Sequence, residues 1–179
     1  MKNKLRIKNS ITGQLVCSML LLVAVFSCTQ RQEISSVNLM HWEQRKVPVS
    51  TVDSLVHGSS YLSVYSEIYS LSEKRTYSLT ATISIRNISS TDSVYLLSSD
   101  YYNTVGELIR TYFNFPILVK PLETLEIVVD EDDKDGGSGA NFVFEWAVNK
   151  GSHEPLFEAV MISTSGQQGI SFTTSGVKR

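Results

Sequence analysis

The sequence is poor in residues that form disulfides or bind metals. Among 179 residues it has two cysteines, Cys17 and Cys28, and three histidines. Cys17 lies in an N-terminal apolar segment that we predict to be cleaved off, so the mature chain has no cysteine pair for an internal disulfide. The histidines also lack metal-ligand spacing. The fold is therefore expected to depend on its hydrophobic core, with no metal and no cofactor.

The sequence also lacks an apolar run of membrane-spanning length. The clearest one, residues 15–26, has twelve residues, whereas a spanning helix needs about 20. A signal-peptide apolar region is about 7–15 residues long, which fits. Basic residues precede the run, at Lys2, Lys4, Arg6 and Lys8. This order predicts a signal peptide over residues 1–27.

The end of that segment predicts a lipid anchor. Val25-Phe26-Ser27-Cys28 resembles the lipobox of bacterial lipoproteins, in which the chain is cut before a cysteine that is then diacylated. Cys28 is the single cysteine of the mature chain, and lipidation explains an unpaired cysteine in an exported protein. We expect a lipid-anchored envelope protein, in the outer membrane or facing the periplasm. An ordinary secretory cut nearby is the alternative.

An excess of positive charge is missing as well. Without residues 1–27 the chain holds 12 basic and 18 acidic residues, a formal charge of −6. Nucleic acids and anionic membrane surfaces attract clustered positive charge, so the composition argues against both as partners. A protein or a glycan remains as a possible partner, and the lipid is the expected membrane contact.

Helical periodicity is absent, and strand alternation takes its place. Residues 28–58 are mostly polar, which predicts a tether, and its Leu39, Met40 and Trp42 are candidates to dock locally on the domain. One domain is predicted over residues 59–179. The clearest strand runs from Thr76 to Arg86, where apolar and polar residues alternate strictly. Further strands are predicted at 61–69, 93–102, 107–113, 117–119, 124–130, 141–148, 156–164 and 169–174.

Short strands separated by turns every 8–12 residues are typical of sandwiches and barrels. The turns contain Gly, Asn, Asp and Ser, for example at 87–92, 103–106, 135–139, 151–152 and 166–169. The sequence therefore predicts an all-β domain, an immunoglobulin-like sandwich of antiparallel sheets. A small β-barrel is the alternative.

An acidic run at residues 130–135 suggests calcium. A helix-loop-helix calcium loop starting at Glu131 would have Asp133, Asp135 and Gly136 in register. Its twelfth position, however, is Phe142, which cannot ligate, and strands flank the loop. The sequence therefore favours a solvated loop, with a calcium-stabilised structural protein as an alternative function.

Candidate catalytic residues are few. Residues 136–140 nearly match the nucleophile elbow around Ser138, but Ala140 replaces the last glycine and a strand follows where a helix is needed. Glu158 lies on a strand that is apolar on both faces, so it needs a partner, Arg86 or Arg110. An envelope enzyme using Glu158, with Glu145 and loop residues, is the alternative to a protein without catalytic activity.

Two loops are the candidate binding sites, because loops on a β scaffold commonly carry binding residues. Glycines in these loops let backbone amides approach a partner closely. Both loops join long strands, which allows them to lie at one end of a sandwich; ordinary turns are the competing interpretation. A further candidate surface is made of six tyrosines in the strands: Tyr61, Tyr65, Tyr69, Tyr101, Tyr102 and Tyr112. The candidate residues are Asp135, Gly136, Gly137, Ser138, Gly139 and Asn141, then Gly166, Gln167, Gln168 and Gly169.

Read in order, several segments resemble one bacterial family, domain of unknown function 3124. The resemblance covers about residues 61–176 and implies a small exported or lipid-anchored protein with a single β domain and no assigned activity. We therefore expect a binding or scaffolding module. The resembling segments are 65–69 (YSEIY), 79–87 (LTATISIRN), 100–102 (DYY), 136–142 (GGSGANF), 158–162 (EAVMI) and 166–169 (GQQG).

Overall fold

The computed structural model describes residues 41–164 and 169–179, which belong to one compact unit. The predicted signal peptide, Cys28, Leu39 and Met40 lie outside the described residues. The described part is all-β, with three short 3-10 helices: η1 (Trp42–Arg45), η2 (Val49–Thr51) and η3 (Gly137–Gly139). None of the helices described is long and apolar enough to cross a membrane.

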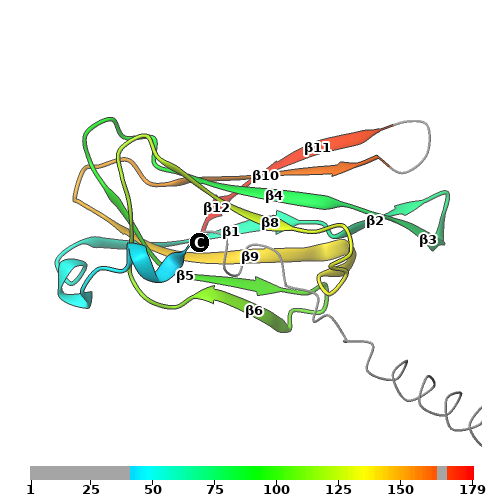
Figure 1. Ribbon diagram of the computed structural model, residues 1–179, viewed down its shortest axis with the longest axis horizontal. Helices are drawn as coiled ribbons and strands as arrows, with labels where there is room; N and C mark the ends of the chain where they lie inside the picture. Colours follow the sequence, from blue (N-terminus) through cyan, green and yellow to red (C-terminus); the bar gives the residue numbers. More distant parts are fainter. Residues whose placement is uncertain (1–40, 165–168) are drawn as a thin grey trace, which may run out of the picture. The chain divides into compact units, whose positions relative to one another are not determined.

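Two antiparallel sheets form the body of the described unit (Figure 1). The larger sheet has the order β12 (Val177–Lys178), β1 (Val56–Val64), β9 (Ala140–Val148), β5 (Val94–Tyr102) and β6 (Leu108–Phe113), with β7 (Ile117–Val119) also on β5. The smaller sheet has the order β11 (Ile170–Ser175), β10 (Leu156–Ser163), β4 (Thr80–Arg86) and β8 (Thr124–Val129). A separate hairpin is made of β2 (Glu67–Ser70) and β3 (Ser72–Ser78).

The two sheets pack face to face over one aromatic and aliphatic core. Phe144 of β9 stacks on Phe157 of β10 with ring centroids 4.4 Å apart. Ala81, Ile83 and Ile85 are fully buried on β4, as the alternation predicts. Among the described residues no strand pair joins the two sheets into a closed ring. The prediction of packed antiparallel sheets is therefore confirmed, and the barrel alternative is not observed.

The chain is ordered well before the strand alternation begins. Trp42 in η1 is buried against Phe113, with ring centroids 5.0 Å apart, so this part of the polar segment docks as expected. β1 starts at Val56, and Gly58 lies beneath Trp146. A Cβ at Gly58 would lie 2.3 Å from the indole ring, so only glycine fits this strand position.

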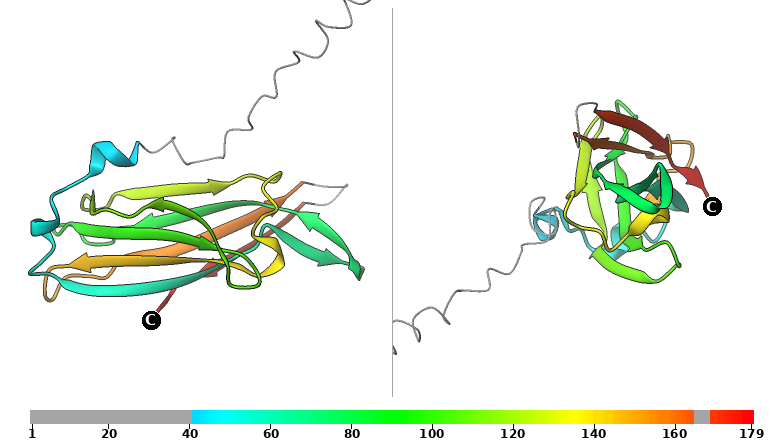
Figure 2. Two further views of the ribbon diagram at one scale, coloured as in Figure 1. Left: turned by 90° about the horizontal axis from the view of Figure 1, so that it is seen from below. Right: turned by 90° about the vertical axis from the view of Figure 1, so that its right-hand side faces the viewer.

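One predicted strand is divided between two sheets. The alternating run from Thr76 to Arg86 forms the last three residues of β3 and all of β4. The division falls at Leu79, whose N–H donates to the Ser66 carbonyl, N···O 2.8 Å. β4 pairs with β8 and β10, whereas β3 pairs with β2. The β2–β3 hairpin therefore continues beyond the end of the two sheets (Figures 1 and 2).

Candidate functional site

Four segments meet at one end of the sandwich. Strand pairing places them there: Val64 pairs with Ala140, Tyr102 with Asn141, and Ile162 with Thr80. We call this the loop end, and Figure 1 shows it at the right. It consists of the β2–β3 hairpin, the turn 103–107, the loop 130–139, and residues 164 and 169 of the β10–β11 loop. Both candidate binding loops therefore start from the same end.

The candidate residues of the β10–β11 loop are only partly described. Gly166, Gln167 and Gln168 lie outside the described residues, and Gly169 is exposed. A Cβ at Gly169 would lie 3.8 Å from the Ser163 carbonyl oxygen, an ordinary contact. This glycine is therefore not required by packing.

The glycines of the other loop are explained by packing and backbone conformation. Gly136 is buried, and a Cβ there would lie 2.0 Å from the Tyr101 hydroxyl and 2.6 Å from Ser66 Oγ. Gly137 has a φ of +72° and, like Gly139, lies against Thr104. A side chain at Gly136 would displace a buried tyrosine, and one at Gly137 would be strained. These glycines allow the loop to sit directly on the core.

Backbone hydrogen bonds hold this loop tightly. The Ser66 N–H donates to the Gly137 carbonyl, N···O 3.1 Å, and the Thr104 N–H and hydroxyl both donate to the Gly136 carbonyl at 3.0 Å. The Gly139 N–H donates in turn to Thr104 Oγ1 at 2.9 Å. The glycine segment is therefore a fixed platform that joins β2, the 103–107 turn and β9.

Ser138 lacks the arrangement of a nucleophile. Its hydroxyl makes no hydrogen bond to any residue that the structure describes, and it follows a positive-φ glycine in a short 3-10 turn. An activated serine needs a base within hydrogen-bonding distance. Asp135 is exposed and Asn141 is half-buried at the start of β9, so the candidate residues of this loop differ widely in access to solvent.

Arg110 forms the centre of a polar cluster under the acidic loop, and sequence reasoning missed it. Its Nη1 lies 2.8 Å from Asp133 Oδ2 and 3.0 Å from the Tyr112 hydroxyl. Only 11% of the Arg110 side chain and 14% of the Asp133 side chain are exposed. This ion pair ties residues 130–135 to β6. Breaking a well-buried pair leaves an uncompensated charge, so the tie is costly to open.

Burial shifts the titration of this cluster. Burial raises the pKa of Tyr101 to about 12, against the opposing effect of its hydrogen bond with Ser66. Burial also raises the pKa of Tyr112, although Arg110 opposes the shift. For Arg110 burial acts in the other direction, but Tyr112 and Asp133 leave its pKa above the usual value. The two tyrosines are therefore neutral and the arginine is charged at physiological pH.

The remaining chemical candidates do not assemble. Glu158 pairs with Arg86, Nε···Oε2 3.0 Å, one of its two predicted partners; Arg110 is used elsewhere. Glu145 follows Phe144 and Glu158 follows Phe157, and those two rings stack between the sheets. The two carboxylates therefore point outward from opposite sheets. Within the described residues, no three side chains of His, Cys, Asp or Glu form a group that could hold a metal ion.

Large apolar side chains are exposed at the loop end. The exposed fractions are 92% for Leu71, 76% for Val105 and 63% for Tyr69. Leu71 also has a φ of +63°, a backbone conformation that a bulky L-residue rarely adopts. The six tyrosines do not form one surface, because Tyr101 and Tyr112 are buried.

Comparisons with known proteins agree with the extent of the β domain. A family model described as "Protein of unknown function (DUF3124)" matches residues 57–178, from β1 to β12. No curated protein matches the chain. Among solved structures, the crystal structure of Thermotoga maritima 1070 is similar with a TM-score of 0.43 and 8% identity, covering 67% of this chain and 92% of that chain.

Proposed function

We propose that this chain, which belongs to the DUF3124 family of proteins of unknown function, is a lipid-anchored protein of the bacterial cell envelope. In this proposal it acts as a binding or scaffolding module and takes a protein or glycan partner at its loop end. The observation that carries the binding role is the exposure of Leu71, Val105 and Tyr69 at the loop end, where hydrogen bonds hold the glycine loop in place.

The loop end combines exposed apolar groups with an ordered backbone, and both features favour binding. Exposed apolar groups that cluster on a soluble surface are commonly interaction sites. The glycine loop beside them is fixed by hydrogen bonds from Ser66 and Thr104. A surface that is already ordered loses little conformational entropy when a partner binds, so more of the contact energy appears as affinity. Tyrosine is also well suited to interfaces, since it offers a large ring and a hydroxyl.

Binding is tested by a pull-down with matched variants of the full chain from envelope extracts of its source bacterium. Tyr69→Ser with Leu71→Ser removes the two exposed large apolar side chains of the hairpin, and we expect captured partner to fall at least about tenfold. The control is Val160→Ser with Ile162→Ser, two exposed apolar residues on the outer face of β10. Equal loss in both double variants would refute a role specific to the loop end.

The second candidate loop has its own test. Gln167→Ala with Gln168→Ala alters the β10–β11 loop without changing any residue of the two sheets. In the proposal this variant keeps the thermal stability of the wild type and captures less of the partner. Unchanged capture would remove this loop from the proposed surface and leave the hairpin and the 103–107 turn.

The anchor part of the proposal rests on the sequence around Cys28. Cys28→Ser removes the sulfur that would carry the lipid, so the protein should lose lipid labelling and appear in the soluble fraction. One acyl chain holds a protein only marginally, and the several chains of a lipoprotein are what make the attachment stable. A variant that stays in membranes after salt and carbonate washes would contradict lipid anchoring.

We propose a role without catalysis, and the immunoglobulin-like class of the sandwich stays a prediction. The opposite orientation of Glu145 and Glu158 supports a role without catalysis, because a general acid and its partner must reach one substrate. The calcium-stabilised alternative loses support because Asp133 already pairs with Arg110. The prediction of an immunoglobulin-like sandwich is supported by the two facing antiparallel sheets.

A further inference from the structure

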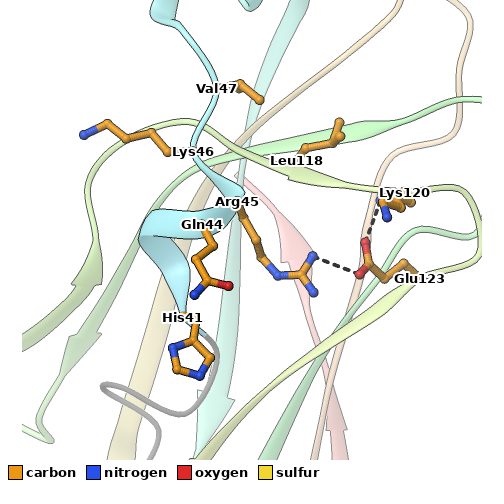
Figure 3. Close-up of a pocket in the computed structure, with 8 residues that line it drawn as sticks. All are labelled: His41, Gln44, Arg45, Lys46, Val47, Leu118, Lys120 and Glu123. Atoms are coloured by element: carbon orange, nitrogen blue, oxygen red, sulfur yellow. Dashed lines mark hydrogen bonds and ion pairs between the residues drawn. The ribbon is translucent and has the colours of Figure 1, made fainter.

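A second surface, away from the loop end, holds a cavity of about 550 Å³. One wall is η1 and the residues just after it, up to Val47; the other is formed by Leu118, Lys120 and Glu123, around the β7–β8 connection (Figure 3). β7 pairs with the first residues of β5, Val94 with Val119, whereas the loop end lies at the last residues of β5. This cavity, which we call the η1 pocket, is therefore independent of the proposed partner surface.

Each oxygen of the single carboxylate in the η1 pocket, Glu123, accepts a hydrogen bond from the protein. Arg45 Nη1 donates to Glu123 Oε1 at 2.8 Å, and the Lys120 backbone N–H donates to Glu123 Oε2 at 2.8 Å. Partial burial works to raise the pKa of Glu123, yet these hydrogen bonds and the nearby positive charges leave it below its usual value. Glu123 therefore stays ionised and serves to orient Arg45.

Other donors in the η1 pocket remain free. Among the described residues, nothing is hydrogen-bonded to the Lys120 ammonium or to the Gln44 side-chain amide, and Arg45 uses only Nη1. Lys46 differs: its ammonium lies 3.7 Å from Glu43 Oε2 and 4.5 Å from the centre of the Phe115 ring. Figure 3 shows the Lys46 side chain pointing away from Arg45 and Gln44. The free donors thus come from both walls of the cavity.

The charge of the lining is opposite to that of the chain. The lining holds Arg45, Lys46 and Lys120 and one carboxylate, Glu123, a formal charge of +2 with His41 neutral; Glu43, which pairs with Lys46, leaves a net local charge of +1. The whole chain carries −2. A local positive site on an acidic protein selects anions, and donors on two separate walls suit an anion whose oxygens point in several directions.

We propose that the η1 pocket binds a phosphate group, held by Lys120, Arg45 and Gln44. A tetrahedral phosphate presents oxygens in more directions than a planar carboxylate, so it is better suited to accept hydrogen bonds from both walls at once. The phosphate is either free or part of a lipid head group. His41 follows Cys28 by thirteen residues, so a chain anchored at Cys28 keeps this pocket within about 45 Å of the membrane surface.

Isothermal titration calorimetry of the full chain in a neutral detergent tests the proposal with two soluble probes. Inorganic phosphate represents the free ligand, and glycerophosphoglycerol represents the head group of an anionic lipid. We expect saturable binding of at least one probe. Lys120→Gln should weaken it about tenfold, since a charge-assisted hydrogen bond is lost. Lys46→Gln removes the same charge from the same lining and should change the affinity less than about twofold.

The outcomes are distinct. Stronger binding of the diester identifies a lipid head group as the source, and stronger binding of inorganic phosphate identifies the free ion. The proposal is overturned if neither probe binds up to about 10 mM, or if Lys46→Gln weakens binding as much as Lys120→Gln. Thermal unfolding of both variants checks that the fold is kept; Lys46 and Lys120 are both exposed, so we expect little change in stability. Failure here leaves the loop-end proposal untouched.

Discussion

β3 and β4 are consecutive strands that differ in both sequence and surroundings: β3 (SEKRTYS) is almost entirely polar, whereas β4 (TATISIR) alternates between apolar and polar residues. β4 has Ala81, Ile83 and Ile85 fully buried, whereas β3 has no buried residue. β4 is paired on both sides and covered by the larger sheet; β3 is paired only with β2. The alternating apolar residues of β4 mark the face that the larger sheet covers, whereas the polar residues of β3 give that strand no apolar face to bury.

The β2–β3 hairpin is ordered although it is exposed, because its base is held by the rest of the domain. A two-stranded hairpin alone is only marginally stable in water. Here Leu79 donates to the Ser66 carbonyl at the base of the hairpin, and Ile68 packs against the core. The tip, with Leu71, has no such support. The body of the sandwich therefore provides the stability, and the hairpin tip is the part that we propose contacts a partner.

The largest expected effect is in the body. Ile83→Asp places a carboxylate where the exposed fraction is zero, and the cation of β4, Arg86, lies on the other face of the strand and pairs with Glu158. An unpaired buried charge costs several kcal/mol, so we expect a loss of more than about 4 kcal/mol and an unfolded protein by circular dichroism.

The neighbouring position is the control. Thr82→Asp lies on the outer face of β4 and is half-exposed, so its carboxylate stays hydrated and the cost should remain about 1 kcal/mol. If both variants unfolded, or if neither did, the distinction between covered and uncovered faces of β4 would be wrong.

A smaller effect is expected at Gly58. Gly58→Ala would bring a Cβ to within 2.3 Å of the buried Trp146 ring, and overpacking a core costs about 1–3 kcal/mol. Denaturant unfolding measures the loss. Gly169→Ala is the matched control, because a Cβ there meets its nearest atom at 3.8 Å. A neutral Gly58→Ala would mean that Trp146 shifts freely, against the tight packing described for β1.

Most strands were predictable from the sequence, for a clear physical reason. In a strand covered on one face, apolar and polar residues alternate along the chain. β5 to β10 match the predicted runs within one or two residues, at 93–102, 107–113, 117–119, 124–130, 141–148 and 156–164. Turn residues between them set the ends. Pairing of β10 with both β4 and β11 also agrees with its apolar residues on both faces.

Other features depend on contacts that a single sequence does not show. Gly58-Ser59-Ser60 resembles the end of a linker, yet it is the interior of β1, where Ser60 Oγ accepts a hydrogen bond from Trp146 Nε1 at 3.0 Å. The Arg110 cluster joins β6 to the acidic loop across 23 residues. The division of the 76–86 run at Leu79 also has no local signal. Each depends on a partner distant in sequence.

Where the body meets the loop end, Tyr101 makes stability depend on pH. Its pKa is raised by burial from 10.0 to about 12, so the folded state keeps the proton that the unfolded chain loses above pH 10. The stability is fully present below pH 10 and is lost as the pH rises toward 12, by up to about 1.4 kcal/mol per pH unit.

Tyr101→Phe tests this assignment. At neutral pH we expect a loss of about 1 kcal/mol, because Ser66 loses its hydrogen-bond partner. Above pH 10 the variant should lose stability less steeply than the wild type, with the remaining slope due to Tyr112. Urea unfolding at pH 8, 10 and 11 gives both slopes. Identical slopes would show that another group causes the alkaline loss.

The smallest effect is expected at the tip of the hairpin, and it is stabilising. Leu71 is 92% exposed with a φ of +63°, so Leu71→Gly loses almost no packing and relieves backbone strain. The backbone strain that is relieved exceeds the entropic cost of a more flexible glycine in the unfolded chain. The free energy of opening the hairpin should therefore rise by about 0.5–1 kcal/mol. Because a hairpin can open locally, the measurement is amide hydrogen exchange of β2 and β3, which should slow about two- to fivefold. Leu71→Ala keeps a Cβ and the strain, so its exchange should match the wild type. Faster exchange in Leu71→Gly would mean that the leucine side chain stabilises the hairpin, which would contradict the contrast between an unsupported tip and the covered strand β4.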